Sequence, residues 1–333
     1  MLDAQIALDQ FQQFEFGSHA FDFESGELRL RWCWNSSTTA QRFEESFQFP
    51  LAGKLGDERR RLLPAAFDLL HWVAGVSYWK LACEGEVAFT KRAPDVWQRL
   101  SLVEVYRQGL AELAWRNQLY RRYWPDFERG ATAVPEPMTG QAGLSRRVLI
   151  ALGGGKDSLV AVERVRAAGF EPLTVQVGSA ALIAETARVA GTEHRMIRRS
   201  LSPKLAEFNR AGAINGHVPI TAINSAALVI AALLWDCDTI VFANERSADT
   251  PTLVHDGHPI NHQFAKSLEF EQRFGEWVNR YIASDLRVFS ILRQETELGV
   301  CREFAALDQY HDVFSSCNRN FHLDGPRTRR WCG

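Results

Sequence analysis

Apolar and polar residues follow two different patterns along the chain. Within the first 125 residues, aromatic and polar side chains alternate over residues 21–32 and 43–49. Alternation with a period of two is typical of antiparallel strands, and two helical patterns follow, from about Arg61 and from about Asp95. Residues 1–125 are therefore predicted to form a smaller α+β domain.

Short apolar runs alternate with helical patterns from residue 148 onward. Strands are expected at 148–152, 173–177, 194–198, 239–243 and 288–292, and helices between them at 157–168, 180–190, 221–235 and 261–282. Such alternation builds a doubly wound, mostly parallel α/β sheet, whose ligands collect at the carboxyl ends of the strands. We predict this α/β domain over residues 146–333, after a linker over residues 126–145 that contains prolines and glycines.

Composition and charge narrow the class of protein. The 333 residues are 46% hydrophobic and 23% charged, as in ordinary soluble globular proteins. A net charge of −2 provides no basic field for nucleic acid, and the longest apolar stretch, residues 226–235, is too short to span a membrane. Six scattered cysteines without a C-x-x-C pair, and an N-terminus without a signal-peptide pattern, favour a cytoplasmic location. The oligomeric state stays open.

The strand predicted at 148–152 is followed by Gly153-Gly154-Gly155-Lys156-Asp157-Ser158 and then by a helical pattern. Backbone N–H groups at a helix N-terminus, glycines that permit close approach and a nearby lysine together favour a phosphate ligand. A Walker loop would need a glycine at position 150 and Ser or Thr at 157, and a Rossmann fingerprint would need a glycine at 158. The alternative is a glycine turn that binds nothing.

The stretch resembles the PP-loop, S-G-G-x-D-S, of enzymes that cleave ATP into AMP and pyrophosphate, with Gly153 in place of the leading serine. The resemblance implies a fold of the PP-loop (adenine nucleotide alpha-hydrolase-like) type. It also implies that the phosphates of ATP are held by Gly153, Gly154, Gly155, Lys156 and Ser158. Asp157 would hold Mg²⁺, the alternative being a helix cap. Adenine would lie beside Gln176, Val177 and Gly178, and the nucleotide site would be completed by Asn244 and Arg246.

Further polar segments follow the other predicted strands, and their order carries a closer resemblance. The segments GGGKDSLV, NGHVPIT, NERS, a VxDGxPxNHQxxKS-like stretch and SCNR resemble the family of ATP-dependent UDP-N-acetylmuramoyl-L-alanyl-L-glutamate epimerases, MurL. The resemblance covers the C-terminal half and extends weakly to residues 70–80. It implies inversion of the terminal L-glutamate of this peptidoglycan precursor to D-glutamate, with ATP converted to AMP and pyrophosphate. Residues 1–125 would then help to grip the uridine and sugar of the substrate.

Epimerisation needs a proton acceptor on one face of the α-carbon and a donor on the other. Histidine suits either task near neutral pH, and His217 and His262 rank first because each lies in a shared motif. The loop histidines His255 and His258 are further candidates, and Glu245, Lys266 and Cys317 follow them. Arg246 and Lys266 are alternatively expected to clamp a carboxylate or the diphosphate.

Two other functions share the predicted ATP loop. One is a PP-loop ligase that passes an adenylated carboxylate to an amine or thiol, and the other is a nucleotide sensor without catalysis. Relatives continue with a C-G-x-C-x-x-C arrangement that, with Cys317, resembles a zinc knuckle, whereas this sequence reaches only Cys332-Gly333. Two cysteines do not fill a tetrahedral zinc site, so no zinc is predicted there.

Overall fold

The computed structural model describes residues 11–51, 53–119, 122–127, 139–255 and 257–316. The strands are β1 (Gln13–Asp22), β2 (Glu27–Asn35), β3 (Ala40–Gln48), β4 (Glu86–Phe89), β5 (Val148–Ala151), β6 (Pro172–Val177), β7 (Glu193–Ser200), β8 (Thr239–Phe242), β9 (Leu253–His255), β10 (His258–Ile260) and β11 (Arg287–Ser290). The helices are α2 (Asp57–Ala74), α3 (Val76–Trp79), α4 (Val96–Gly109), α5 (Ala111–Arg116), α6 (Lys156–Ala167), α7 (Ala181–Ala190), α8 (Pro203–Arg210), α9 (Ile220–Trp235), α10 (Leu268–Tyr281) and α11 (Glu297–Ala305). The described residues also form the short 3₁₀ helices η2 (Arg246–Asp249), η3 (Phe264–Lys266) and η4 (Asp308–Tyr310).

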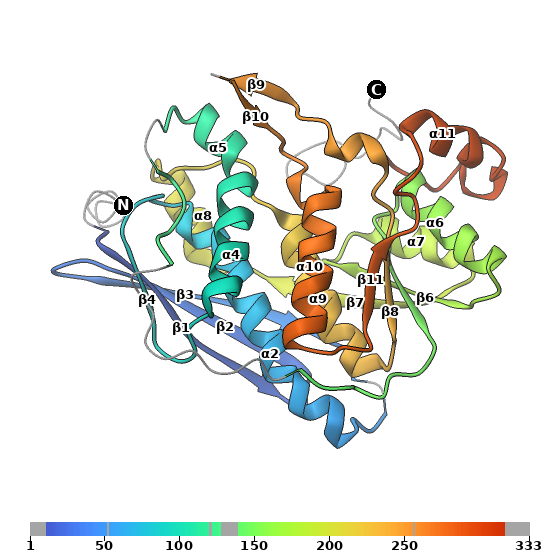
Figure 1. The fold of residues 1–333 in the computed structure, drawn as a ribbon, viewed down its shortest axis with the longest axis horizontal. Helices are drawn as coiled ribbons and strands as arrows, with labels where there is room; N and C mark the ends of the chain where they lie inside the picture. The colour runs from blue at the N-terminus through green and yellow to red at the C-terminus, as the bar shows by residue number, and fades with distance from the viewer. Residues whose placement is uncertain (1–10, 52, 120–121, 128–138, 256, 317–333) are drawn as a thin grey trace.

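The five predicted strands of the second half form a parallel array in the order β11-β8-β5-β6-β7 (Figure 1). From β5 the chain moves outward to β6 and β7, and it then returns to the other side of β5 to add β8 and β11. The winding direction therefore reverses between β5 and β8, and ligands of doubly wound sheets bind outside the strand ends at such a point. The predicted α/β fold with a mostly parallel sheet is confirmed.

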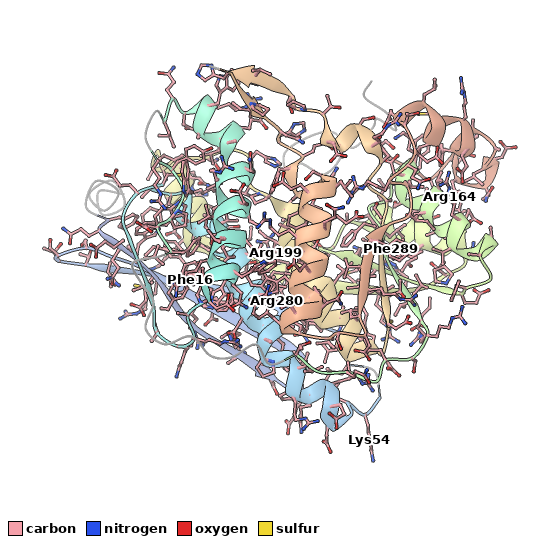
Figure 2. All side chains as sticks on the ribbon, viewed as in Figure 1. Phe16, Lys54, Arg164, Arg199, Arg280 and Phe289 are labelled. Atoms are coloured by element: carbon pink, nitrogen blue, oxygen red, sulfur yellow. The ribbon has the colours of Figure 1, made fainter. Side chains whose placement is uncertain are left out.

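The N-terminal strands continue the same sheet. The expected antiparallel strands are present as β1, β2 and β3, and β3 pairs antiparallel with β7 through Ser46 opposite Ser200. The fully buried Glu45 contacts Arg199 at 2.5 Å and accepts a hydrogen bond of 2.9 Å from the hydroxyl of Tyr78. Figure 2 labels Arg199 near the middle of the molecule. The two halves therefore share one sheet, and their division into two domains stays a prediction.

Helices cover both faces of the parallel strands. Along β5, Leu149 packs into a core with β1–β3, α2, α9 and α10, whereas Val148 and Ile150 pack into a second core with α6, α7 and α11. Successive residues of a strand point to opposite faces, so the short apolar run is buried on both sides. The parallel strands thus lie between two helical layers. The loops that follow these strands lie at the edge of the sheet.

Several elements differ from the sequence expectations. The helix expected at 261–282 begins only at Leu268, because Ser267 caps it by accepting a hydrogen bond of 3.2 Å from the N–H of Phe270. Residues 261–267 instead form a loop with η3, and the β9–β10 hairpin precedes them. Within residues 126–145, whose role as a linker stays a prediction, the N–H groups of Ala142 and Gly143 donate to the carboxylate of Asp285 at 2.8 and 2.9 Å. These elements depend on capping and long-range bonds that apolar periodicity does not report.

None of the helices within the described residues is both long enough and apolar enough to cross a membrane.

Candidate functional site

The predicted nucleotide loop, residues 153–158, joins β5 to α6 at the point where the sheet reverses its winding. Gly154 has a φ of +76°, in the region that favours glycine. The hydroxyl of Ser158 accepts from the N–H of Gly153 at 3.3 Å and donates to the carbonyl of Gly155 at 2.9 Å. Among the described residues, the N–H groups of Gly154 and Gly155 have no acceptor, and they lie at a helix N-terminus. This turn therefore offers an anion-binding end.

Residues 315 and 316 contact the loop from the far end of the chain. The N–H of Ser315 donates to the carbonyl of Gly154 at 2.9 Å, and the N–H of Lys156 donates to the hydroxyl of Ser316 at 3.2 Å. A Cβ added to Gly155 would lie 3.2 Å from the Ser316 hydroxyl, so this approach favours glycine at position 155. The predicted candidate Cys317 follows directly in the sequence and lies outside the described residues.

The loop lysine is paired with two carboxylates. The Nζ atom of Lys156 lies 2.6 Å from Oδ1 of Asp157 and 2.8 Å from Oε1 of Glu297, at the start of α11. Burial acts to lower the pKa of Lys156, but the two carboxylates outweigh it and raise the pKa, so the ammonium stays charged. Burial raises the pKa of Asp157, which Lys156 opposes. Glu297 had no signal in the sequence, because its contact with the loop is long-range.

Asp157 lies in the first turn of α6, and the N-cap of this helix is Gly155. Its carboxylate contacts Lys156, so the alternative of an N-cap residue does not describe it. Within the described residues, no group of three or more His, Cys, Asp or Glu side chains is arranged to hold a metal ion. A single carboxylate beside a phosphate site still fits Mg²⁺, because this ion is commonly held by one or two carboxylates, phosphate oxygens and water.

The loop after β8 lies across the reversal point from the glycine loop. The N–H of Asn244 donates to the hydroxyl of Ser290 at 2.5 Å, and the N–H of Arg246 donates to the carbonyl of Glu295 at 2.9 Å. The side chain of Glu245 caps η2 by accepting 2.6 Å from the N–H of Ser247. These bonds tie the ends of β8 and β11 together beside the glycine loop.

Lys266 links this region electrostatically. Its side chain is solvent-exposed but stands among many neighbouring groups, and desolvation lowers its pKa. The negative charges of Asp157 and Glu245 oppose that shift, so both carboxylates act on the ammonium. Lys266 therefore interacts electrostatically with both the glycine loop and the loop after β8.

His217 and His262 lie side by side, although they come from different loops. Their ring centroids are 5.8 Å apart and their planes are nearly perpendicular, at 86°. Nδ1 of His262 lies 2.5 Å from the hydroxyl of Thr252. Burial lowers the pKa of His217. Glu112 of α5 and a hydrogen bond with the backbone of His262 oppose this effect, and the charges of His262 and Lys266 reinforce it. His217 is therefore neutral at pH 7 and able to accept a proton, within electrostatic reach of Lys266.

Gln176 has a structural role at the end of β6. Its buried side-chain amide donates to the carbonyl of Gly178 at 2.8 Å, and its Oε1 lies 3.0 Å from Nε2 of His194. Gly178 has a φ of +102° and donates its N–H to the carbonyl of Ile197 at 2.8 Å. Because β6 neighbours β5, Val177 and Gly178 lie at the edge that carries the glycine loop, and their contact with adenine stays a prediction.

Lys80 anchors the loop that carries His217. Its buried ammonium donates to Oδ1 of Asn209 at 3.0 Å, to the carbonyl of Ile214 at 3.2 Å and to Oδ1 of Asn215 at 2.9 Å. Burial lowers the pKa of Lys80 to about 8. Lys80 ends the weakly matching stretch 70–80, but its role depends on contacts that are remote in sequence.

We expect Lys80→Met to lower the free energy of unfolding by about 2–4 kcal/mol at pH 7, because three acceptors lose a charged donor. The ordinary lysine pKa is 10.5, so the unfolded chain binds more protons than the folded chain between pH 8 and 10.5. Stability of the wild type should therefore rise with pH relative to the variant. Urea unfolding of both proteins at about pH 7 and pH 10 should show a growing difference, and a constant or shrinking difference would contradict a buried ammonium.

Comparisons with known proteins agree with the predicted family. A sequence profile described as "MurL N-terminal domain" matches residues 5–291. Three curated relatives are named UDP-N-acetyl-alpha-D-muramoyl-L-alanyl-L-glutamate epimerase. The protein of Xanthomonas oryzae pv. oryzae is 40% identical over 328 residues, which is 97% of this chain and 71% of the relative. Those of Salinispora tropica and Micromonospora sp. are 38% and 37% identical, over 98% of this chain and 71% and 72% of their own lengths.

One solved structure is described as a predicted subunit of a tRNA methyltransferase from Methanocaldococcus jannaschii. It is 17% identical with a TM-score of 0.33, and the match covers 49% of this chain and 76% of that chain. A likeness this low supports no functional inference. The identities to the curated relatives, over nearly all of this sequence, and the profile match show that the chain belongs to the MurL family of epimerases, which are enzymes of the isomerase class.

Proposed function

We propose that this chain epimerises the terminal L-glutamate of UDP-N-acetylmuramoyl-L-alanyl-L-glutamate to D-glutamate, with ATP cleaved to AMP and pyrophosphate. The observation that carries the proposal is that Lys266 interacts electrostatically both with Asp157 of the glycine loop and with His217, whose ring lies beside that of His262. The glycine loop suits a nucleotide phosphate, and the histidine pair suits proton transfer at carbon. The substrate named for the curated relatives supplies the identity of that carbon.

The chemistry explains why an epimerase would need ATP. Removing the α-proton beside a free carboxylate places a carbanion next to an existing negative charge. A positioned base contributes roughly 10²–10⁴-fold, or about 3–5 kcal/mol of the barrier. Adenylation removes the carboxylate charge and gives the enolate a stabilising carbonyl, so the ATP loop and the histidines serve one reaction.

The proposed sequence has three steps. A carboxylate oxygen of glutamate attacks the α-phosphorus of ATP, the bond to the bridging oxygen breaks, and pyrophosphate leaves. One histidine of the pair then removes the α-proton of the acyl-adenylate, and the other donates a proton to the opposite face. Water finally cleaves the mixed anhydride and releases AMP and the inverted acid.

Residues of this chain are assigned to these steps by position. The N–H groups of Gly154 and Gly155, the hydroxyl of Ser158 and the ammonium of Lys156 would hold the leaving pyrophosphate. Asp157 would hold Mg²⁺, which neutralises phosphate charge when bound. His217 and His262 would carry the protons, with Glu245 and Lys266 as the alternatives nearest to the loop. A cytoplasmic location remains a prediction from the cysteine pattern.

Chiral analysis of glutamate released from the reacted dipeptide substrate tests the proposal. With ATP and Mg²⁺ present, D-glutamate and pyrophosphate should both appear, and solvent deuterium should enter Cα only when ATP is supplied. Exchange without ATP would contradict adenylation. An amide formed when an amine is added would favour the ligase alternative, and ATP binding without pyrophosphate release would favour a sensor.

A further inference from the structure

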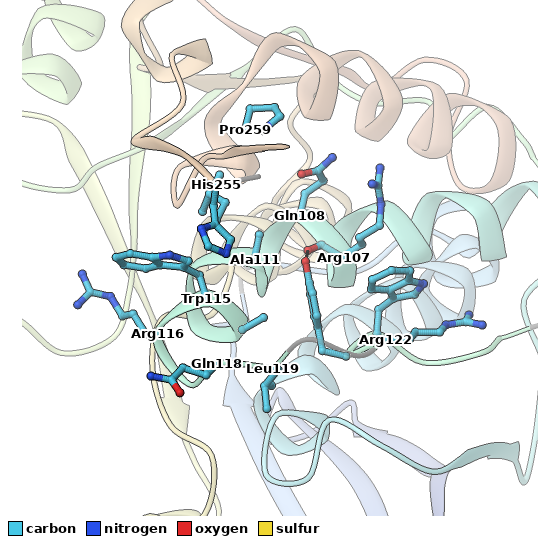
Figure 3. Close-up of a pocket in the computed structure, with 14 residues that line it drawn as sticks. Arg107, Gln108, Ala111, Trp115, Arg116, Gln118, Leu119, Arg122, His255 and Pro259 are labelled. Carbon is cyan, nitrogen blue, oxygen red and sulfur yellow. Dashed lines mark hydrogen bonds between the residues drawn. The ribbon is translucent and has the colours of Figure 1, made fainter. Parts of the chain in front are cut away.

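A cavity of about 1070 Å³ lies between the end of α4, α5, residues 122–124 and the β9–β10 hairpin (Figure 3). Figure 3 shows Trp115 and His255 at one end of the cavity and Arg107 and Arg122 at the other. Trp115 is 40% exposed, so part of its indole is open to a ligand in the cavity. The cavity therefore combines an aromatic surface with cationic side chains.

The guanidinium groups at the cavity are held in place by neighbouring acceptors. Arg107 donates to Glu104 at 2.7 Å, and Arg116 donates to Glu112 at 2.7 Å while stacking on Trp115 at 5.9 Å. Each guanidinium has five N–H donors, so these single bonds fix its plane and leave donors for a ligand. A planar fork of this kind suits phosphate oxygens, and an exposed indole suits the flat face of a nucleobase.

Both walls of the cavity lead to the histidine pair. On α5, Ala111 and Trp115 line the cavity, and Glu112 between them acts on the pKa of His217. On the hairpin, Ile260 lines the cavity, and the flanking Thr252 and His262 lie 2.5 Å apart. A ligand seated in the cavity can therefore extend a chain toward the two imidazoles.

We infer that this cavity takes the nucleoside diphosphate end of the substrate, with the base against Trp115 and the diphosphate on the arginines. The inference rests on the proposed function and extends it, because the cavity shares no lining residue with the predicted ATP loop, residues 153–158. ATP and the nucleoside diphosphate end of the substrate would then occupy different pockets. The volume exceeds that of a single small acid and suits a nucleotide-sized ligand.

Binding of UDP to the full chain, measured by calorimetry without ATP, tests the inference. UDP should bind and should be displaced by UDP-N-acetylmuramoyl-L-alanyl-L-glutamate. Trp115→Ala and Arg107→Ala should each weaken UDP binding about 10-fold, because a lost stacking or charged contact commonly has this effect. Trp115→Phe should restore most of it, and ATP binding should change little in all three variants.

A matched control is Arg188→Ala, which removes an exposed arginine paired with Glu185 on α7, as Arg107 is paired with Glu104. Absence of UDP binding, unchanged UDP binding in the cavity variants, or equal loss of ATP binding would overturn the inference. The outcome is independent of turnover. UDP bound in the cavity without D-glutamate formation would contradict only the proposed reaction. Epimerisation with UDP binding that is insensitive to both variants would contradict only the assignment of the cavity to UDP.

Discussion

Asp157→Asn should reduce pyrophosphate release about 10²–10³-fold, which is the usual effect of removing one preorganised charged group from a reacting centre. The carboxylate at the start of α6 is the predicted Mg²⁺ ligand, and it lies 2.6 Å from the ammonium of Lys156. Asparagine keeps the size of the side chain but loses the charge that holds both cations. The fold should change little, because a partly buried first-turn acid contributes at most about 2 kcal/mol to a helix. Pyrophosphate release and urea unfolding measure the two effects separately.

Glu297→Gln is the matched control for this change. Its carboxylate also contacts Lys156, at 2.8 Å, but it belongs to α11 and not to the loop. We expect this variant to retain pyrophosphate release within a few-fold of the wild type. Equal losses of pyrophosphate release in both variants would mean that Lys156 needs both neutralising carboxylates alike. This result would contradict a specific role for Asp157 in holding the metal.

The parallel part of the fold could be predicted closely because each strand is a short apolar run buried on both faces. Val148 and Ile150 pack against one helical layer and Leu149 against the other, so the run itself indicates its surroundings. The junction between β3 and β7 could not be predicted in this way. It is stabilised by the pair of Glu45 and Arg199, two charged residues that local patterns would place on a surface.

The candidate site, like the fold, could be predicted from the sequence only where the signal is local. The glycine loop could be predicted because its residues are contiguous and their backbone conformation is local, as with Gly154. Lys80, Glu112 and Glu297 have no such signal, since each acts on a loop residue that is remote in the sequence. Their roles follow from tertiary packing, which local sequence patterns do not report.

His217→Gln and His262→Gln should each slow epimerisation about 10²–10⁴-fold, the contribution expected of one positioned acid or base. Pyrophosphate should still form, because the glycine loop is unchanged, and the adenylate should then hydrolyse without inversion. Because the proposal assigns the two histidines to opposite faces of the α-carbon, each variant should block deuterium exchange from one epimer only. Mass spectrometry of reactions in D₂O, started separately from the L- and D-glutamyl substrates, would reveal this asymmetry. His19→Gln, at a histidine bonded to Asp68 of α2, is the control and should exchange both epimers.

The pH dependence gives an independent check on the same pair. Because burial lowers the pKa of His217, its neutral form should persist below the ordinary histidine value of 6.5. The kcat/KM of the direction in which His217 removes the proton should therefore stay level from neutral pH down to that value and fall only below it. His217→Gln should abolish both this decline of kcat/KM at acidic pH and the deuterium exchange in that direction. Full exchange of both epimers by each single variant would transfer the acid and base roles to the other candidates predicted from the sequence, which are Glu245, Lys266, Cys317, His255 and His258.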